Sequence, residues 1–304
     1  MSPPMEDELA FAAIKASLDH AGPGEKVLLN SADYYGSDPQ TANVELASRF
    51  FEQNPDYVDK ALLCIKVSTP LRGAQNPQRQ PDSSPENIRK SVANIQRILG
   101  NHKSLDIFEP ARLDHNHTVE EVVTTLKQLQ NEGILKYIGL SEVAPIATVE
   151  MEVSPWTYDE NIREVIAAAG ELGVTVLAYS PIGRGFLTGN ITPETLDANS
   201  VMRRFPRFSD EAMVENKKIV DIISALAQKK GISNAQLCIA WVSSLGDHVV
   251  PLPGSTNVSR TVENFAANKI VFTPAEKKEI DQAVMSFQAV GDRYPTAHMA
   301  YLNQ

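Results

Sequence analysis

Short apolar runs alternate with segments of helical period along most of this chain. The strand-like runs cover residues 27–31, 62–67, 105–109, 137–141, 146–152, 174–179 and 248–252. The helical segments cover residues 6–20, 42–51, 85–99, 118–131, 161–172, 215–230 and 258–268, and Ser83 and Ser84 form a cap before the third of them. Such alternation predicts a parallel sheet or barrel with helices outside it. We therefore predict one α/β domain, residues 1–304, close to a (β/α)8 barrel.

Two features do not fit a complete barrel. About five residues separate Ser141 from the run that begins near Ile146, whereas a parallel crossover with its helix needs at least about ten. A helix also precedes the first visible strand, which leaves seven strands where closure requires about eight. An incomplete gene model or a splice-type variant would explain this, and so would an open or rearranged barrel. The first explanation is favoured, because so short a parallel crossover has no easy geometric solution.

Composition narrows the class of protein. With 42% hydrophobic and 22% charged residues, the chain resembles ordinary globular proteins, and no stretch approaches the roughly 18 apolar residues of a membrane span. The acidic first residues, 1–8, lack the basic character of a targeting signal, so we expect a cytoplasmic protein without membrane partners. The net charge of −10 argues against nucleic-acid binding, although a local basic pocket for an anionic cofactor remains compatible with it.

The two cysteines fit the core better than a disulfide or a metal site. Cys64 lies in a predicted strand and Cys238 in a predicted helix, and neither has a neighbour at metal-ligand spacing. We therefore expect no bound metal and no disulfide.

The stretch 179–189 is the most informative part of the chain. An apolar run ends in Tyr179, Ser180 and Pro181, and three glycines follow within seven residues, at positions 183, 185 and 189. This pattern predicts a buried parallel strand that opens into a loop with exposed backbone groups. In barrels and open α/β sheets, ligands sit at that end of the strands. A glycine-rich loop without a ligand is the alternative.

A tyrosine and a lysine are placed for proton transfer. Tyr35 follows the first predicted strand and Lys66 lies within the next, so both would face the same strand-end site. A tyrosine can donate a proton to a developing oxyanion, and a nearby cation lowers the tyrosine pKa from about 10. The two residues therefore predict a donor and the group that activates it.

Four separated motifs resemble those of the aldo-keto reductase family. They are Asp33-Tyr34-Tyr35-Gly36 with the strand residue Lys66, the Gly139-Leu140-Ser141 turn, the stretch 179–189, and Pro251-Leu252-Pro253-Gly254-Ser255-Thr256 followed by Arg260, Glu263 and Asn264. The resemblance covers residues 27–293 in the right order. It implies a barrel of the aldo-keto reductase type and an NADP-dependent oxidoreductase acting on aldehydes or alcohols.

The resemblance also implies roles for individual residues. Tyr35 would donate the proton and Lys66 would lower its pKa, while Ser141 and Glu150 would hold the nicotinamide amide and Tyr179 would stack on the ring. The pyrophosphate would lie among Ser180, Pro181, Gly183 and Arg184, and the adenosine 2′-phosphate would lie at the Gly254 turn between Ser255 and Arg260. Glu263 and Asn264 would contact the adenine. An arginine that opens a helix opposite a Gly-Ser-Thr turn suits a phosphate, so NADP(H) is expected rather than NAD(H).

Two departures from the family pattern bear on the chemistry. The usual acidic partner of the lysine falls at Asn30, and the usual histidine falls at Ala111. A missing carboxylate still favours tyrosinate character, but a missing histidine removes a donor that orients the carbonyl. Arg112 or a water would replace that donor, unless Arg112 forms a salt bridge with Asp114. Both departures are similar to those of fungal pyridoxal reductases.

For the other candidate residues, a role in packing or at the surface explains the sequence better than a role in binding or catalysis. His115 and His117 would need a third ligand to hold a metal, and we expect them to be solvated. Trp241 lies on an apolar helical face and is expected in the core. Trp156 follows a strand end, where it would line a pocket or simply pack.

Two functions remain open at this stage. The first is an NADPH-dependent reductase of a small aromatic aldehyde, with pyridoxal as the first candidate. The second is a regulatory protein that keeps the nucleotide site without turnover, which the lost histidine and the missing elements favour. The oligomeric state is left open.

Overall fold

The computed structural model describes the chain except for residues 1–4, 36–40, 68–80, 115, 142–147 and 296–304. The residues group into two compact units, which are considered one at a time. The first unit comprises Met1–Val149, Ser255–Thr261 and Asn303–Gln304, and the second comprises Glu150–Gly254 and Val262–Leu302.

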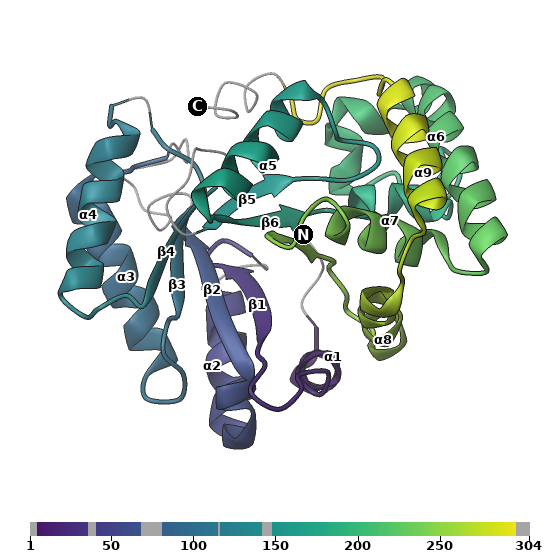
Figure 1. Cartoon of the computed structure of the whole chain (residues 1–304). Helices are drawn as coiled ribbons and strands as arrows, with labels where there is room; N and C mark the ends of the chain where they lie inside the picture. The colour runs from purple at the N-terminus through teal and green to yellow at the C-terminus, as the bar shows by residue number, and fades with distance from the viewer. Residues whose placement is uncertain (1–4, 36–40, 68–80, 115, 142–147, 296–304) are drawn as a thin grey trace. The chain divides into compact units, whose positions relative to one another are not determined.

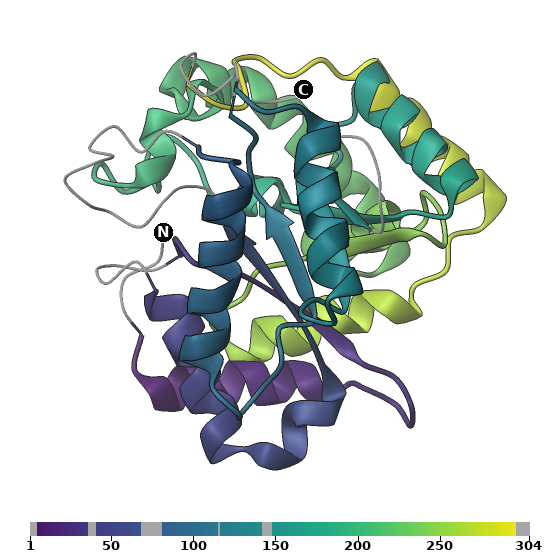
Figure 2. The same ribbon diagram turned by 90° about the vertical axis from the view of Figure 1, so that its left-hand side faces the viewer.

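The first unit alternates strands and helices. Its elements are α1 (Asp7–Leu18), β1 (Val27–Ala32), α2 (Ala42–Gln53), a 3-10 turn (Pro55–Lys60), β2 (Ala61–Val67), α3 (Pro85–Leu99), β3 (Ile107–Pro110), α4 (Val119–Asn131) and β4 (Tyr137–Ser141). The four strands are parallel and neighbour one another in chain order (Figure 1). Helices α3 and α4 lie side by side along these strands (Figure 2).

Side-chain alternation divides the strands of this unit into two faces. On β2, Leu63, Ile65 and Val67 belong to a core cluster that also contains residues of α2, α3 and α4. Cys64 and Lys66 alternate with them and therefore project from the opposite face. The helix-facing side holds the core, so the other side is left for polar groups.

Local capping signals fix several helix ends. The Ser84 hydroxyl accepts from the Asn87 backbone N–H at 3.3 Å, with Pro85 as the first helical residue, as the sequence predicts. Helix α4 begins after Thr118, which forms a capping box with Glu121. The predicted starts and ends of α3, α4 and β4 agree with the structure to within a residue.

The second unit continues the parallel pattern. It contains most of β5 (Thr148–Glu152), then α5 (Glu160–Leu172), β6 (Thr175–Tyr179), α6 (Asp210–Lys230), α7 (Asn234–Ser243), β7 (Val249–Leu252), most of α8 (Val258–Ala266), and α9 (Pro274–Ser286). Strands β6 and β7 pair in parallel, from Val176 opposite Val249 to Tyr179 opposite Leu252. Strand β6 follows β5 in the sheet order.

Some predicted boundaries were wrong. Helix α6 begins at Asp210 rather than residue 215, because the Ser209 hydroxyl caps it by accepting from the Ala212 backbone N–H. Helix α8 ends at Ala266, and a 3-10 turn (Ala267–Lys269) replaces its predicted end. Strands β3 and β7 start two residues and one residue later than the apolar runs that predict them, at Ile107 and Val249.

The described residues contain seven strands, in line with the strand number read from the sequence. The six positions between β4 and β5, 142–147, lie outside the described residues, and so does the predicted strand start at Ile146. Cys64 and Cys238 are both buried, as expected of core residues.

Candidate active site

The first unit brings Tyr35 and Lys66 together. Lys66 Nζ lies 5.2 Å from the centre of the Tyr35 ring, and the Asp33 backbone N–H donates to the Lys66 carbonyl at 2.9 Å. Lys66 is 3% exposed, whereas Tyr35 is 36% exposed, so the phenol is accessible and the ammonium is not. The arrangement places a buried positive charge next to an accessible acid, which favours the tyrosinate.

The lysine also contacts the position where the family pattern has an acid. Lys66 Nζ donates to Asn30 Oδ1, and the register pairs Asn30 with Cys64 on β2. An amide oxygen can accept this hydrogen bond but cannot neutralise the ammonium. The positive charge of Lys66 is therefore not balanced by Asn30.

Arg112 approaches Ser141 at the ends of β3 and β4. Arg112 Nη1 lies 3.4 Å from the Ser141 hydroxyl and also donates to the Ala111 carbonyl. Asp114 instead accepts from the backbone N–H groups of Ser83 and Asn116 and from His117. The alternative expectation, a salt bridge between Arg112 and Asp114, was wrong. The Asp114 carboxylate instead accepts hydrogen bonds from backbone N–H groups and from the imidazole of His117.

His117 is not a solvated side chain, contrary to expectation. Its Nδ1 lies 2.9 Å from Asp114 Oδ1, and about a quarter of the imidazole is exposed. Burial tends to raise the pKa of the Asp114 carboxyl, but hydrogen bonds from Ser83 and His117 outweigh that effect and hold it below its usual range. The neighbouring His115 lies outside the described residues. Among the described residues, no group of three His, Cys, Asp or Glu side chains is placed to hold a metal.

In the second unit, the end of β6 opens into a loop of left-handed backbone. Ser180, Gly183, Arg184 and Gly185 all have positive φ, of 53°, 57°, 56° and 93°. Serine and arginine rarely adopt this conformation, so the surrounding contacts must hold it in place. The backbone N–H groups of Gly183 and Gly185 donate to the Ser180 and Ile182 carbonyls, so the turns close on themselves.

Arg184 is held by aromatic rings and a buried acid. Its guanidinium carbon lies 4.3 Å from the Phe205 ring centre and 4.8 Å from that of Tyr294, and Nη2 lies 3.5 Å from Glu152 Oε2. The Tyr294 hydroxyl lies 3.1 Å from that of Tyr179. The segment around Tyr294 therefore fixes both the predicted ring-stacking residue and the loop behind it.

Arg207 adds a second partly buried guanidinium to this part of the second unit. It donates to the Thr157 hydroxyl at 2.6 Å and to the carbonyls of Trp156 and Gly291. Burial lowers its pKa from the usual value, and the charge of Glu152 partly offsets this effect. The sequence did not single out Arg207, Phe205 or Tyr294, because their partners are distant along the chain.

Trp156 packs inside the second unit. Its ring stacks on Phe186 with centres 4.4 Å apart, and it meets Phe208 edge to face. A Cβ built on Gly183 would lie 3.0 Å from the Trp156 ring. Of the two roles left open, the structure shows the packing role. Trp241 is fully buried, as expected.

Replacing Gly183 tests how tightly this loop is built. We expect Gly183→Ala to lower the free energy of unfolding by about 2–3 kcal/mol, because alanine pays about 1–2 kcal/mol for the left-handed conformation and also meets the Trp156 ring. Gly231→Ala is the matched control, since Gly231 has φ +74° with open space around it. Urea unfolding of the two variants measures the difference. An equal decrease in the free energy of unfolding would show that the Trp156 ring moves aside without cost.

The remaining predicted cofactor residues lie on the turn before α8 and on α8 itself. In the turn, the Ser255 hydroxyl lies 2.9 Å from the Asn257 carbonyl, and the Asn257 side chain caps the helix by accepting from the Ser259 backbone N–H. Arg260 is exposed, with Nη2 3.4 Å from the Thr256 hydroxyl. Gly254 before the turn is also exposed.

Two residues further along α8 are more enclosed. Glu263 Oε1 accepts from the Ser233 hydroxyl at 2.5 Å, and Asn264 is buried. In the strands, Ser141 and Glu150 are buried as well. Pro181 and Gly183 are buried within the β6 loop.

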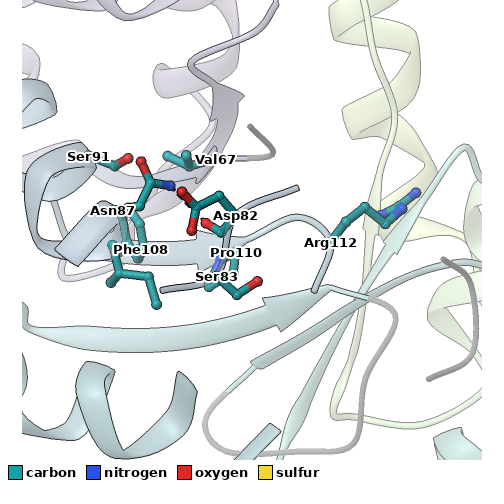
Figure 3. Close-up of a pocket in the computed structure, with 9 residues that line it drawn as sticks. Val67, Asp82, Ser83, Asn87, Ser91, Phe108, Pro110 and Arg112 are labelled. Atoms are coloured by element: carbon teal, nitrogen blue, oxygen red, sulfur yellow. Dashed lines mark hydrogen bonds between the residues drawn. The ribbon is translucent and has the colours of Figure 1, made fainter. Parts of the chain in front are cut away.

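A pocket in the first unit lies on the helix side of β2 and β3. Figure 3 shows its polar residues Asp82, Ser83, Asn87 and Ser91 near Val67, Phe108 and Pro110, with Arg112 set apart from them. Lys66 alternates with Val67 and projects from the opposite face of the sheet. This pocket is therefore distinct from the Tyr35 and Lys66 pair, and we assign it no catalytic role.

Comparisons with known proteins agree on one family. The family model described as aldo/keto reductase family matches residues 2–285. A probable aldo-keto reductase 1 of Glycine max is 32% identical over 302 residues, covering 96% of this chain and 84% of the relative. In Schizosaccharomyces pombe, a probable pyridoxal reductase 2 is 30% identical and covers 87% and 83%. The aldo-keto reductase yakc [NADP(+)] of the same yeast is 30% identical and covers 93% and 86%.

A solved structure shares the fold. The glycerol dehydrogenase of Gluconobacter oxydans superposes with a TM-score of 0.77 at 23% identity, covering 93% of this chain and 87% of that one. The strand order and this superposition together show an α/β barrel fold of that type. No helix in the described part of the chain is long and apolar enough to cross a membrane.

Proposed function

The chain belongs to the aldo/keto reductase family, and from this premise we propose that it is an NADPH-dependent carbonyl reductase of small aromatic aldehydes. Pyridoxal, reduced to pyridoxine, is the first candidate substrate. The observation that carries the proposal is the buried Lys66 ammonium beside the accessible Tyr35 phenol. A family member that had lost the reaction would not need to keep this pair.

The chain's own contribution to the reaction is proton donation. NADPH, when bound, would supply the hydride that adds to the carbonyl carbon. Tyr35 then gives its phenolic proton to the oxygen, so that the aldehyde leaves as an alcohol and the tyrosinate is reprotonated from solvent. Lys66 lowers the pKa of Tyr35, because a positive charge about 5 Å away stabilises the tyrosinate.

Arg112 is the residue that we propose in place of the histidine lost at Ala111. Its guanidinium reaches the Ser141 hydroxyl at the ends of neighbouring strands in the first unit. From there it can donate to a carbonyl oxygen, which would orient the substrate as the lost imidazole does.

The residues of the second unit fit the pyrophosphate and ring of the cofactor. Support for an anion site comes from the left-handed backbone at Ser180 and Gly183 and from the guanidinium of Arg184 in the same loop. We propose that this loop, with Pro181, holds the pyrophosphate and that Tyr179 stacks on the nicotinamide. Glu150 would bind the nicotinamide amide, and Glu263 and Asn264 would contact the adenine.

The residues of the first unit fit the other polar ends of NADPH. Ser255 and Arg260, after Gly254, would hold the adenosine 2′-phosphate, because an exposed guanidinium stands one turn from a serine in a capped helix start. Ser141 would bind the nicotinamide amide. The two cysteines, Cys64 and Cys238, are buried in the core, and we propose a cytoplasmic enzyme.

A substrate panel tests the proposed function. We expect NADPH oxidation with pyridoxal to exceed that with aliphatic aldehydes at equal concentration, with pyridoxine as the product by chromatography. An active enzyme that prefers other aldehydes would overturn the pyridoxal assignment alone.

The alternative is a nucleotide-binding protein without turnover. It is favoured by Ala111 at the histidine position and by the seven strands of the described residues. If a fluorescence titration shows that NADPH binds, but NADPH is not oxidised with any aldehyde of the panel, the alternative is established and the reductase proposal is refuted.

Arg260 decides the choice between NADPH and NADH. A charge-assisted contact contributes about 1.5–3 kcal/mol, so we expect Arg260→Ala to weaken NADPH binding by roughly ten- to a hundredfold and leave NADH nearly unchanged. Arg97→Ala, another exposed arginine, controls for the change in net charge. Fluorescence titration with both nucleotides measures the effect, and equal weakening of both would refute the assignment.

A further inference from the structure

Glu109 is a buried carboxylate for which the family pattern of motifs gives no role. It lies in β3, is 0% exposed, and pairs in register with Lys66 on β2. A carboxylate removed from water is costly unless an opposite charge and hydrogen bonds compensate it. Its presence in the strand layer of the first unit therefore needs an explanation.

The surroundings place Glu109 on the face of the sheet that carries Lys66. Cys64 Sγ lies 3.5 Å from Glu109 Oε2, and Cys64 and Lys66 share one face of β2. A Cβ built on Gly139 of β4 would lie 3.4 Å from Glu109 Oε2 and would collide with Thr148 Oγ1. Glycine at position 139 thus leaves the space that the carboxylate occupies.

Strand geometry puts the two side chains on the same face of neighbouring strands. Neighbouring strands lie about 4.8 Å apart, and residues paired in a parallel register present their side chains on the same face. Lys66 has Glu109 as its register partner on one side and Ala32 on the other. On the alanine side the lysine reaches the neutral Asn30 amide, which supplies no charge.

We propose that Glu109 on β3 is the carboxylate that balances the positive charge of Lys66. It would take the role of the family's usual acid, whose position on β1 is occupied here by Asn30. This inference rests on the proposed reductase function, since Lys66 acts there through Tyr35. Glu109 is a positioning residue: it touches neither substrate nor cofactor, and it keeps Lys66 protonated in a buried setting.

Other ionisable groups share this region and must be accounted for. Within the first unit these are Asp33, Tyr34 and Tyr35 from the turn after β1, Cys64 from β2 and Arg112 from the segment after β3. Asp33 is the nearest rival, because it is buried and its backbone N–H donates to the Lys66 carbonyl. Asp33→Asn is therefore the matched comparison, since it removes one negative charge next to the same lysine.

The pH dependence of reduction tests the proposal. Loss of a negative charge lowers the pKa of both Lys66 and Tyr35, so in Glu109→Gln the activity should fall away at a pH about one to two units lower than in the parent. Near pH 6 the variant should keep most of its activity. Glu109→Asp should return the alkaline limb toward the parent position. A purely structural role would lower activity at every pH instead.

A second measurement needs no turnover and separates this inference from the proposed function. Ultraviolet difference titration follows tyrosinate formation, and Tyr35→Phe identifies which transition belongs to Tyr35. We expect the Tyr35 transition of Glu109→Gln to lie about one to two pH units below that of the parent. If the parent reduces no aldehyde and this shift is still seen, the charge pair stands and the reductase proposal fails.

The outcomes that overturn the inference are equally distinct. An unchanged pH limb and unchanged tyrosine titration in Glu109→Gln would remove Glu109 from the role, and a shift in Asp33→Asn alone would give it to Asp33. If Glu109→Gln does not fold, the double variant Lys66→Gln with Glu109→Gln decides, because removing both partners of a charge pair should restore folding. Failure of the double variant as well would contradict the pairing.

Discussion

Tyr35→Phe should lower the rate of aldehyde reduction by about a hundred- to ten-thousandfold while NADPH binding persists. The variant keeps the ring and its edge-to-face contact with Tyr34, but it loses the phenolic proton. General acid catalysis contributes about that factor, and an accessible phenol beside Lys66 is the acid that we place in the reaction. Steady-state rates with pyridoxal and a fluorescence titration with NADPH measure the two effects separately.

Retention of more than about a tenth of the parent rate would remove Tyr35 from the mechanism. Asp33 and Arg112 would then be the residues to test as donors. Tyr34→Phe is the matched control, since it removes the neighbouring hydroxyl and keeps the aromatic pair. Its reduction rate should stay close to that of the parent.

The variant Lys66→Met should lose most of its reductase activity at neutral pH, and this activity should not return at any accessible pH. A unit charge about 5 Å away, at an effective dielectric constant near 20, is worth about 3 kcal/mol, or about two units of the Tyr35 pKa. Without it Tyr35 stays protonated but is a weaker acid, so we expect a fall of about ten- to a hundredfold. A pH profile of kcat with pyridoxal measures this.

Lys66→Arg controls for the charge, because it keeps a cation at the same strand position. It should retain more activity than Lys66→Met, and both should be checked for folding by thermal unfolding. A folded Lys66→Met with at least half of the parent kcat would contradict the role of the lysine.

Much of the fold was predictable because its signals are local. Alternation of apolar runs predicts all seven strands of the described residues, and Ser84 and Thr118 mark helix starts that lie where expected. The start of α6 was missed because its first turn carries Asp210 and Glu211 and little apolar periodicity. Capping boxes at Ser233 with Gln236 and at Thr273 with Glu276 would have given the starts of α7 and α9.

The site was predictable only where the motif itself carries the contact. Tyr35 and Lys66 come from adjacent strand ends, so their proximity follows from the parallel order. The pairing of Glu109 with Lys66 depends on the register of β2 against β3, which apolar periodicity does not fix to one residue. The contact of Arg184 with Tyr294 joins segments about 110 residues apart, and no local pattern announces it.

The loop after β6 can form all of its contacts only after the stretch that ends at Tyr294 has been synthesised. Val290 exchanges two hydrogen bonds with the Asn216 side chain, Gly291 accepts from Arg207, and Tyr294 contacts both Tyr179 and Arg184. The ribosome adds about 5–20 residues per second, so Tyr294 is joined roughly 5–20 seconds after the β6 loop. A nascent chain stalled in between would carry Arg184 in an unfavourable conformation without one of the two rings that hold it. The loop after β6 is therefore among the last parts of the second unit to reach its final form.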